Sequence, residues 1–219
     1  MLNYLFDGLF YYFLFNLIFY TTNFLLYLID TNEIFDDYKL QNKKGSKLML
    51  IYKKCLPISL KNTFIYNLPA IMTLPFFINW YGFTFSWYKV GIDLILSYVL
   101  MDFFYYVTHR ILHTNYFYAT YHKQHHEITA PVGLTATYMT VVDLYTNILS
   151  IYLPPIILSS CHTTITLWMI ISTLNTILIG HSGYSVIATF HDNHHQHFNY
   201  NYGVGILADR IFGTIYVYK

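Results

Sequence analysis

Charged side chains are scarce in this sequence: Asp, Glu, Lys and Arg together make up 11% of its 219 residues. A soluble domain carries about 25% of such residues, so the composition indicates a chain in contact with lipid. The net charge is only +1, and no Lys/Arg-rich tract is present. Because binding to a phosphate backbone needs a basic surface, we expect no nucleic acid partner.

Cysteine is also rare. Cys55 and Cys161 form no C-x-x-C motif, and the topology inferred below places them on opposite membrane faces, so we expect no disulfide between them. The apolar N-terminus lacks a Lys/Arg-rich start and an A-x-A cleavage site before Asp30. It is therefore interpreted as a retained anchor and not as a cleaved signal peptide.

Apolar residues, in contrast, account for 55% of the chain, and they form runs long enough to cross a bilayer, which takes about 20 residues. The candidate spans are residues 4–29, 63–81, 90–108, 136–158 and 163–180. Pro69 and Pro75 would kink the second, and the first could instead be a hairpin or an interfacial helix. We predict an all-α integral membrane bundle of four to five transmembrane helices with a cytoplasmic, histidine-rich helical cap.

Lysines between the first and second spans give the orientation. Seven of the twelve basic residues lie there, namely Lys39, Lys43, Lys44, Lys47, Lys53, Lys54 and Lys61. The positive-inside rule makes this loop cytoplasmic. Counting spans from it, residues 109–135 and those after 181 also face the cytoplasm. We expect residues 1–89 to supply membrane anchor segments and the lysine-rich loop, and residues 90–219 to form the catalytic domain of the same structural unit.

No histidine occurs in the first 108 residues, and all eleven lie between positions 109 and 197. Three motifs stand out: HRILH at 109–113, HKQHH at 122–126 and HDNHH at 191–195. Spacings of three and four place side chains on one helix face, where two imidazoles can converge on one metal ion. Imidazole suits iron, zinc, copper and nickel, so ligand type alone leaves the metal open.

We expect eight histidines in these motifs to hold two metal ions: His109, His113, His122, His125, His126, His191, His194 and His195. His181, at the cytoplasmic end of the last span, is expected to join them. His197 lies beyond the third motif and is balanced between a ligand and a surface residue. His162 falls in a luminal turn and is expected to bind nothing.

The three motifs resemble the histidine boxes H-R-x-x-H, H-x-x-H-H and H-D-x-H-H of the fatty acid hydroxylase/sterol desaturase superfamily of membrane di-iron enzymes. The segment 102–110 (DFFYYVTHR) resembles the family's approach to the first box, and 180–184 (GHSGY) resembles its H-x-G-Y element. Segments 199–203 and 209–214 resemble its tail. The resemblance covers about 102–216, roughly half of the chain.

Within the superfamily, HEITAPVGLT at 126–135 looks most like the 4-methylsterol oxidase branch, although sphingoid-base hydroxylases share part of it. Where sterol branches often carry His-Pro, this chain has Thr140-Val141. The resemblance implies oxygen-dependent hydroxylation or desaturation of a lipid, with a 4-methylsterol as the favoured substrate. Alternatives are a sphingoid base, a fatty acid, or desaturation of a sterol.

Breaking an unactivated C–H bond requires a metal that changes oxidation state, which zinc cannot do. The resemblance implies that the working cofactor is two iron ions, although zinc can occupy the same nitrogens in a purified sample. No haem-binding His-Pro-Gly-Gly motif is present, so electrons must come from outside, from a cytochrome b5-type donor and its NAD(P)H reductase. Molecular oxygen and a membrane lipid complete the set of partners, and we expect an endoplasmic reticulum location.

Ligating histidines usually donate their second nitrogen to a carboxylate or carbonyl. The candidate carboxylates are Asp102, Glu127, Asp143, Asp192 and Asp209. Acids within spans are costly in lipid, so Asp102 and Asp143 are expected to face the bundle interior. As solvated loop acids, Glu127 and Asp192 would have no such role, and the sequence leaves both readings open.

Other functional classes fit less well. A transporter would place histidines near the middle of the bilayer, a metalloprotease would need H-E-x-x-H, and a bis-histidine haem protein would need paired histidines within separate spans. A non-catalytic relative that binds metal and lipid as a scaffold stays open.

Overall fold

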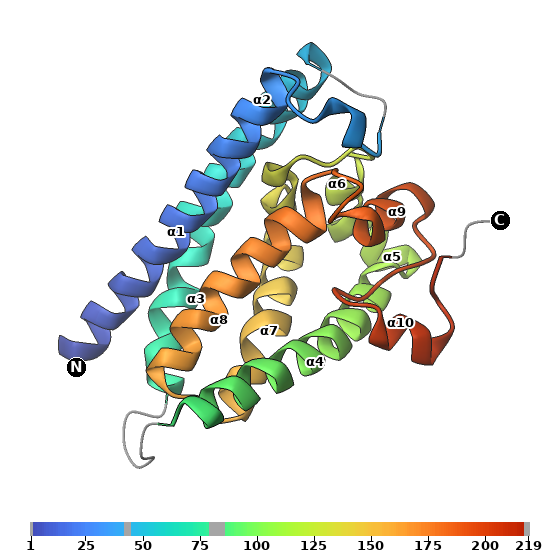
Figure 1. The fold of residues 1–219 in the computed structure, drawn as a ribbon. Coiled ribbons are helices and arrows are strands. Elements are labelled where there is room, and N and C mark those ends of the chain that lie inside the picture. Colours follow the sequence, from blue (N-terminus) through green and yellow to red (C-terminus); the bar gives the residue numbers. More distant parts are fainter. Residues whose placement is uncertain (1, 42–44, 79–85, 217–219) are drawn as a thin grey trace.

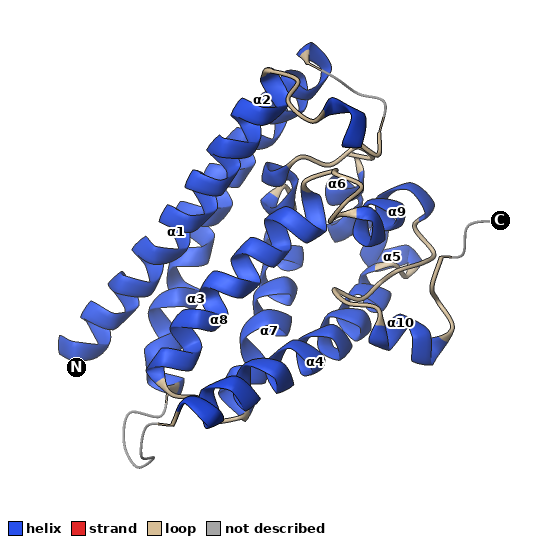
Figure 2. Cartoon of the chain, viewed as in Figure 1, coloured by secondary structure: helices blue, strands red, loops and turns tan. Residues whose placement is uncertain are grey.

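The structure, a computed structural model, describes residues 2–41, 45–78 and 86–216. Within these ranges the regular elements are helices, with a single isolated bridge between Lys39 and Tyr184, so the predicted all-α bundle is confirmed (Figures 1 and 2). The long elements are α1 (Leu2–Thr31), α2 (Ser46–Lys61), α4 (Trp87–Leu112), α7 (Val141–Ile157) and α8 (His162–Leu174).

Short elements connect these helices and close one end of the bundle. Before α4 the chain passes through η1 (Asp36–Tyr38), η2 (Asn62–Tyr66), α3 (Asn67–Thr73) and η3 (Leu74–Phe77). After α4 come α5 (Asn115–Phe117), η4 (Tyr118–His122), α6 (Lys123–His126), η5 (Gly133–Thr137), η6 (Asn175–Gly180), α9 (Thr189–His197) and α10 (Leu207–Phe212). Figure 1 shows α5, α6, α9 and α10 gathered near the C-terminal end of α4.

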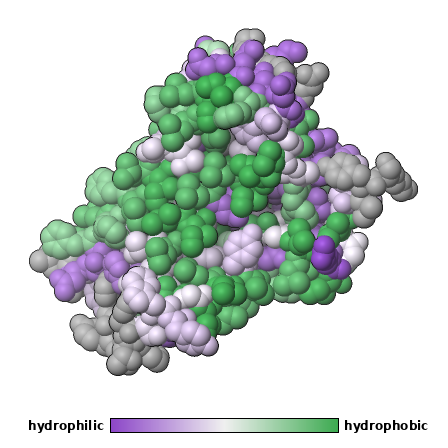
Figure 3. Space-filling model, in the orientation of Figure 1, coloured by the Kyte–Doolittle hydropathy of each residue, from purple (hydrophilic) through white to green (hydrophobic). Residues whose placement is uncertain are grey.

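Three helices in the described residues are long and apolar enough to cross a bilayer: Asn3–Thr31, Trp87–Leu112 and His162–Gly180. Their outward side chains are large and apolar, and Phe13, Leu17 and Ile95 are each at least 65% exposed. Figure 3 shows the result as a broad hydrophobic surface with hydrophilic groups gathered at its two ends. A surface of this kind, on helices of this length, is typical of a protein embedded in lipid.

Two of the expected spans differ from the observed helices. The run 63–81 is the second half of a helical path that begins at Ser46 and is broken by a π-turn at Asn62–Tyr66 and a 3-10 turn at Leu74–Phe77; residues 79–81 lie outside the described residues. The run 136–158 begins as a helix only at Val141, because Gly133–Thr137 forms a buried 3-10 turn first. Periodicity alone could not distinguish this turn from the start of a span.

The expectation of a lysine-rich loop was wrong in part. Residues 46–61 form helix α2, which packs beside α1, so Lys47, Lys53, Lys54 and Lys61 lie along a helix. Lys39 is no surface lysine at all, since its side chain is only 3% exposed. It lies against the segment that follows η6, where its ammonium donates to the carbonyl of Ser182 at 2.9 Å.

A buried ionic network ties the end of α1 to the element around His181. The carboxylate of Asp30 accepts hydrogen bonds from Tyr52 at 2.8 Å and Tyr184 at 2.6 Å, and it pairs with the Lys39 ammonium at 2.7 Å. The ammonium also lies 3.8 Å from the centre of the Tyr184 ring. Burial lowers the pKa of Lys39, and the neighbouring carboxylate opposes that effect.

Removing one charge of this network should destabilise the fold strongly. We expect Asp30→Asn to lower the free energy of unfolding by about 3 kcal/mol or more, because it leaves the Lys39 ammonium buried without a counter-charge. Thermal unfolding of the purified protein in detergent measures the effect. Glu127→Gln is the control: its pair with Lys54 is 44–48% exposed, and such pairs contribute at most about 1 kcal/mol. Equal losses in the two variants would contradict the prediction.

Candidate metal centre

Nine histidines from distant parts of the chain meet in two adjacent groups. The first cluster consists of His109, His113, His122, His126 and His194, and the second cluster of His125, His181, His191 and His195. Within each cluster, one ring nitrogen per residue lies within 4.8 Å of all the others. Every member except half-buried His113 is buried. All nine histidines predicted as ligands are therefore brought together.

Helical spacing decides which cluster each histidine joins. His109 and His113, and likewise His122 and His126, are four apart and share the first cluster, while His191 and His195 share the second. The pairs with spacing three divide between clusters. A residue four positions on is rotated by about 40° around the helix, whereas one three positions on is rotated by about 60° the other way. Each H-x-x-H-H motif thus contributes histidines to both clusters. The expectation that histidines three and four apart share one helix face did not predict this division.

Non-α turns occur directly before two of the ligand-bearing segments. The π-turns Tyr118–His122 and Asn175–Gly180 end at His122 and immediately before His181. One π-turn shifts the helical register by a residue, and such turns are frequent at functional sites. Here they set the direction in which these two imidazoles leave the backbone.

Hydrogen bonds at Nδ1 fix the tautomer of four rings. His109 contacts the carbonyl of Tyr202 at 2.8 Å, His194 that of Tyr200 at 2.6 Å and His181 that of Thr176 at 2.8 Å. His122 contacts the carboxylate of Asp143 at 2.7 Å. Carbonyl and carboxylate oxygens only accept, so the proton of each neutral ring is on Nδ1 and the lone pair is on Nε2.

The Nε2 atoms of the first cluster fit a single metal ion. Those of His109 and His122 are 3.0 Å apart, and those of His113 and His194 are 3.1 Å apart. Imidazole nitrogens bind a transition metal at about 2.0–2.1 Å, so two of them at right angles lie about 3 Å apart. In the second cluster the Nε2 atoms of His125 and His181 are 3.4 Å apart.

Electrostatics also favour a cation. Burial, with the neighbouring imidazoles, lowers the pKa of five rings well below the ordinary value: His125, His126, His191, His194 and His195. Burial lowers the pKa of His181 to about 4. These rings are therefore neutral near pH 7 and can donate lone pairs. Both ring nitrogens of His195 and Nε2 of His191 are buried without a hydrogen-bond partner in the protein, which is costly unless a ligand binds there.

The carboxylates expected beside the histidines have other partners, apart from Asp143. Asp102 accepts from the backbone N–H groups of Gly205 and Ala208, and Asp209 accepts from those of Tyr202 and Gly203. These two carboxylates affect the site indirectly, because they hold the backbone loop whose Tyr202 carbonyl accepts a hydrogen bond from His109. At Gly203 a Cβ would lie 2.4 Å from an Asp102 oxygen, so only glycine fits there.

The other two predicted acids also bond to groups other than the imidazoles. Glu127 is partly exposed and bonds with Lys54 and Tyr138. Asp192 is buried and accepts from Gln41 and Gln196, and burial raises its pKa. Among hydrogen bonds of the described residues, the only one between a carboxylate and a clustered imidazole is that of Asp143.

The remaining positions singled out in the sequence lie outside the clusters. His162 is the first residue of α8, at the end of that helical path away from His181, and its ring packs on Phe10. The ring of His197 stacks on that of Tyr216, with 4.1 Å between the ring centres. Thr140 precedes α7, where its hydroxyl donates to the Tyr121 carbonyl at 2.8 Å and accepts from the backbone of Asp143. It holds the turn that presents Asp143 to His122.

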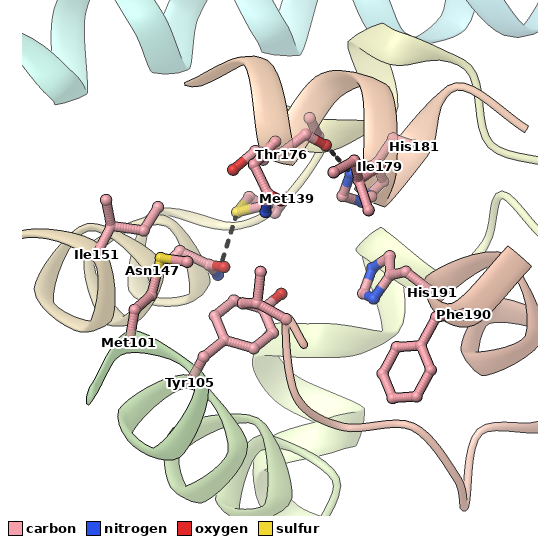
Figure 4. Close-up of a pocket in the computed structure, with 14 residues that line it drawn as sticks. Met101, Tyr105, Met139, Asn147, Ile151, Thr176, Ile179, His181, Phe190 and His191 are labelled. Carbon is pink, nitrogen blue, oxygen red and sulfur yellow. Dashed lines mark hydrogen bonds between the residues drawn. The ribbon is translucent and has the colours of Figure 1, made fainter. Parts of the chain in front are cut away.

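A cavity reaches the second cluster from inside the bundle, and we refer to it as the central cavity. His181 and His191 line one end, and its other walls are largely apolar: Met101, Tyr105, Ala136, Met139, Asn147, Ile151, Asn175, Thr176, Ile179, Gly180, Phe190 and Val204. Figure 4 shows these two imidazoles facing the space that Tyr105 and Met139 also border. Asn147 donates to the Met139 sulfur at 3.7 Å across it. The cavity has a volume of about 40 Å³, and its apolar walls lead directly to the imidazoles of the second cluster.

Asp143 offers a test of the cluster geometry. We expect Asp143→Asn to weaken metal retention about 10- to 100-fold, because the charged acceptor that orients His122 is lost. Competition between the purified protein and a chelator, followed by elemental analysis, measures retention. Glu127→Gln should retain metal like the unmodified chain, since its carboxylate contacts no imidazole. Equal retention in Asp143→Asn would mean that other contacts orient His122.

Comparison with known proteins agrees with this geometry. The sequence profile of the fatty acid hydroxylase family matches residues 94–214, which is more than half of the chain. Human fatty acid hydroxylase domain-containing protein 2 is 29% identical over 219 residues, covering 93% of this chain and 65% of the human protein. Methylsterol monooxygenase 2-2 of Arabidopsis thaliana is 28% identical, covering 81% of this chain and 73% of that protein.

Fatty acid hydroxylase ahd1 of Mycosarcoma maydis is also 28% identical, with 83% of this chain and 50% of that protein covered. With 65% of the human protein covered, the chain spans less than two thirds of that relative's length. No solved structure is significantly similar to it. The family match over residues that include all three histidine motifs confirms the prediction from the sequence: this chain belongs to the fatty acid hydroxylase family.

Proposed function

We propose that the chain is an oxygen-dependent membrane oxidoreductase that holds two iron ions and hydroxylates a lipid. The observation that carries the proposal is the convergence of nine imidazoles on two adjacent points, with an apolar cavity that ends at His181 and His191. The first cluster would supply five nitrogens to one ion and the second cluster four to the other. Bound iron would supply the activation of dioxygen, because it changes oxidation state and zinc does not.

The arrangement of the chain's own residues suits a lipid substrate. The apolar walls of the central cavity would exclude water, and a lipid that entered between them would bring a C–H bond beside His181 and His191. Tyr105, Asn147, Asn175 and Thr176 supply polar groups among these walls, and such groups can orient a hydroxyl near the reacting carbon. This combination favours a lipid with a polar group close to the reaction site, such as a 4-methylsterol.

The sources of electrons and the location follow from the same proposal. Hydroxylation places one oxygen atom in the product and reduces the other to water with two external electrons. We infer a cytochrome b5-type donor with its NAD(P)H reductase as that source. The lysines of α2 lie at the end of the bundle where the histidine motifs are, as the Lys54–Glu127 contact indicates. By the positive-inside rule this end faces the cytoplasm, and we infer the endoplasmic reticulum as the membrane from the family membership alone.

A metal transporter is the main competing class. A transporter would distribute its ligands along a path through the bilayer, whereas these nine histidines form one compact pair of clusters at a single end of the bundle. A non-catalytic metal-binding scaffold differs from an enzyme only in turnover, which the lipid assay below measures.

Metal content tests the cofactor. We expect about two irons per chain by elemental analysis, with a Mössbauer signal from coupled ions. His194→Ala removes a nitrogen from the first cluster and His125→Ala removes one from the second, so each variant should lose mainly one of the two ions. His197→Ala, outside both clusters, is the matched control and should keep both. Protein that takes up no transition metal under anaerobic iron loading would refute the proposal.

Lipid profiling tests the substrate. A host that expresses the chain should show fewer 4-methylsterols than one that expresses the His125→Ala/His194→Ala double variant. New 2-hydroxy fatty acids or hydroxylated sphingoid bases with unchanged sterols would assign the alternative substrate. If no lipid class differs between the two hosts even with a donor and reductase present, the scaffold reading replaces the enzyme.

A further inference from the structure

A groove on the outer face of the bundle lies between α1 and α2. It encloses a volume of about 320 Å³ and is lined by Tyr20, Asn23, Phe24, Tyr27, Met49, Tyr52, Lys53, Leu56 and Leu134. None of these residues lines the central cavity. The groove is thus a separate space, to which the proposed reaction assigns no role.

The groove has a buried floor and exposed apolar walls. Asn23, Tyr52 and Leu134 form the floor and are at most 5% exposed. On the walls, Phe24 of α1 is 59% exposed and Leu56 of α2 is 42% exposed. In a helix hairpin at a membrane, such a hollow is filled by an acyl chain, since water would leave these apolar walls unfavourably hydrated.

The charged residues of helix α2 all have one sign. Helix α2 carries four lysines, at positions 47, 53, 54 and 61, and no Asp or Glu. Lys54 pairs with Glu127 and Lys61 lies over the Tyr66 ring at 5.2 Å. Lys53 is the cation that lines the groove itself, and its side chain is exposed.

The position of Lys53 along the hairpin matches a lipid headgroup. Its neighbour Tyr52 packs against Tyr27, near the end of α1 where Asp30 and the lysine-bearing segment lie. Deeper along α1, Tyr20 bonds with Thr63 at 2.6 Å and closes the lower part of the hairpin. A lysine at the membrane surface extends its ammonium toward the headgroups while its methylenes stay on apolar neighbours.

We propose that this groove binds one anionic phospholipid of the surrounding bilayer, with an acyl chain against Phe24 and Leu56 and the phosphate beside Lys53. A juxtamembrane lysine favours an anionic over a zwitterionic lipid by roughly fivefold in binding. The apolar hollow supplies a fixed position for the chain that a flat helix surface would not. Because the groove shares no residue with the central cavity or the clusters, this inference does not depend on the proposed reaction.

Native mass spectrometry of the full chain, released from detergent, provides the test. The probes are dioleoyl phosphatidic acid and dioleoyl phosphatidylcholine, added at equal concentrations. We expect one tightly retained lipid per chain, with phosphatidic acid favoured about fivefold. Lys53→Glu should abolish the preference, whereas Lys61→Glu makes the same charge change on the same helix outside the groove and should keep it.

A second variant distinguishes the contribution of the apolar groove to lipid binding from that of the Lys53 charge. Leu56→Trp places a large side chain in the groove, so retention of both lipids should fall while all lysines stay in place. Thermal unfolding and size-exclusion profiles confirm that each variant is folded. Equal retention of the two probes, or a preference that survives Lys53→Glu, would overturn the proposal. So would a stable dimer that Leu56→Trp dissociates, because a second copy of the chain would then occupy the groove.

Discussion

The structure depends on directing nine imidazoles, eight of them buried, at two points. Buried polar nitrogens are costly when they lack partners, and like-charged rings so close together cannot all be protonated. The described residues provide one carboxylate in direct contact with the clusters, that of Asp143. A bound cation would stabilise these lone pairs, and the surrounding fold holds the rings in the positions that such an ion needs.

Holding the rings is the work of elements that are far apart in the sequence. Helix α4 carries His109 and ends directly before His113. The tail after α9 returns to this helix, so that the carbonyls of Tyr200 and Tyr202 fix the rings of His194 and His109. Asp102 and Asp209 bind the backbone of that same tail. On the opposite side, the Asp30–Lys39 pair holds the segment that carries His181.

The bilayer explains why this arrangement is built on long apolar helices. They carry most of the apolar walls of the central cavity, which borders the second cluster at His181 and His191. The hairpin of α1 and α2 has a different role in the structure. Its inner face supports the turn Gly133–Thr137, and its outer face carries the groove and the lysines.

The sequence by itself determined the helical class, the apolar spans near Leu2–Thr31, Trp87–Leu112 and His162–Gly180, and the nine histidines of the centre, because hydropathy and i, i+4 spacing are local properties. Tertiary structure alone decided how each H-x-x-H-H motif divides between the two clusters and which acids reach a ring. It also placed the side chain of Lys39 in the interior, although the sequence suggested that Lys39 is one of the lysines of a cytoplasmic loop. These features depend on which segments meet in space, and a counter-charge such as Asp30, nine positions away, becomes a partner only when the chain folds back.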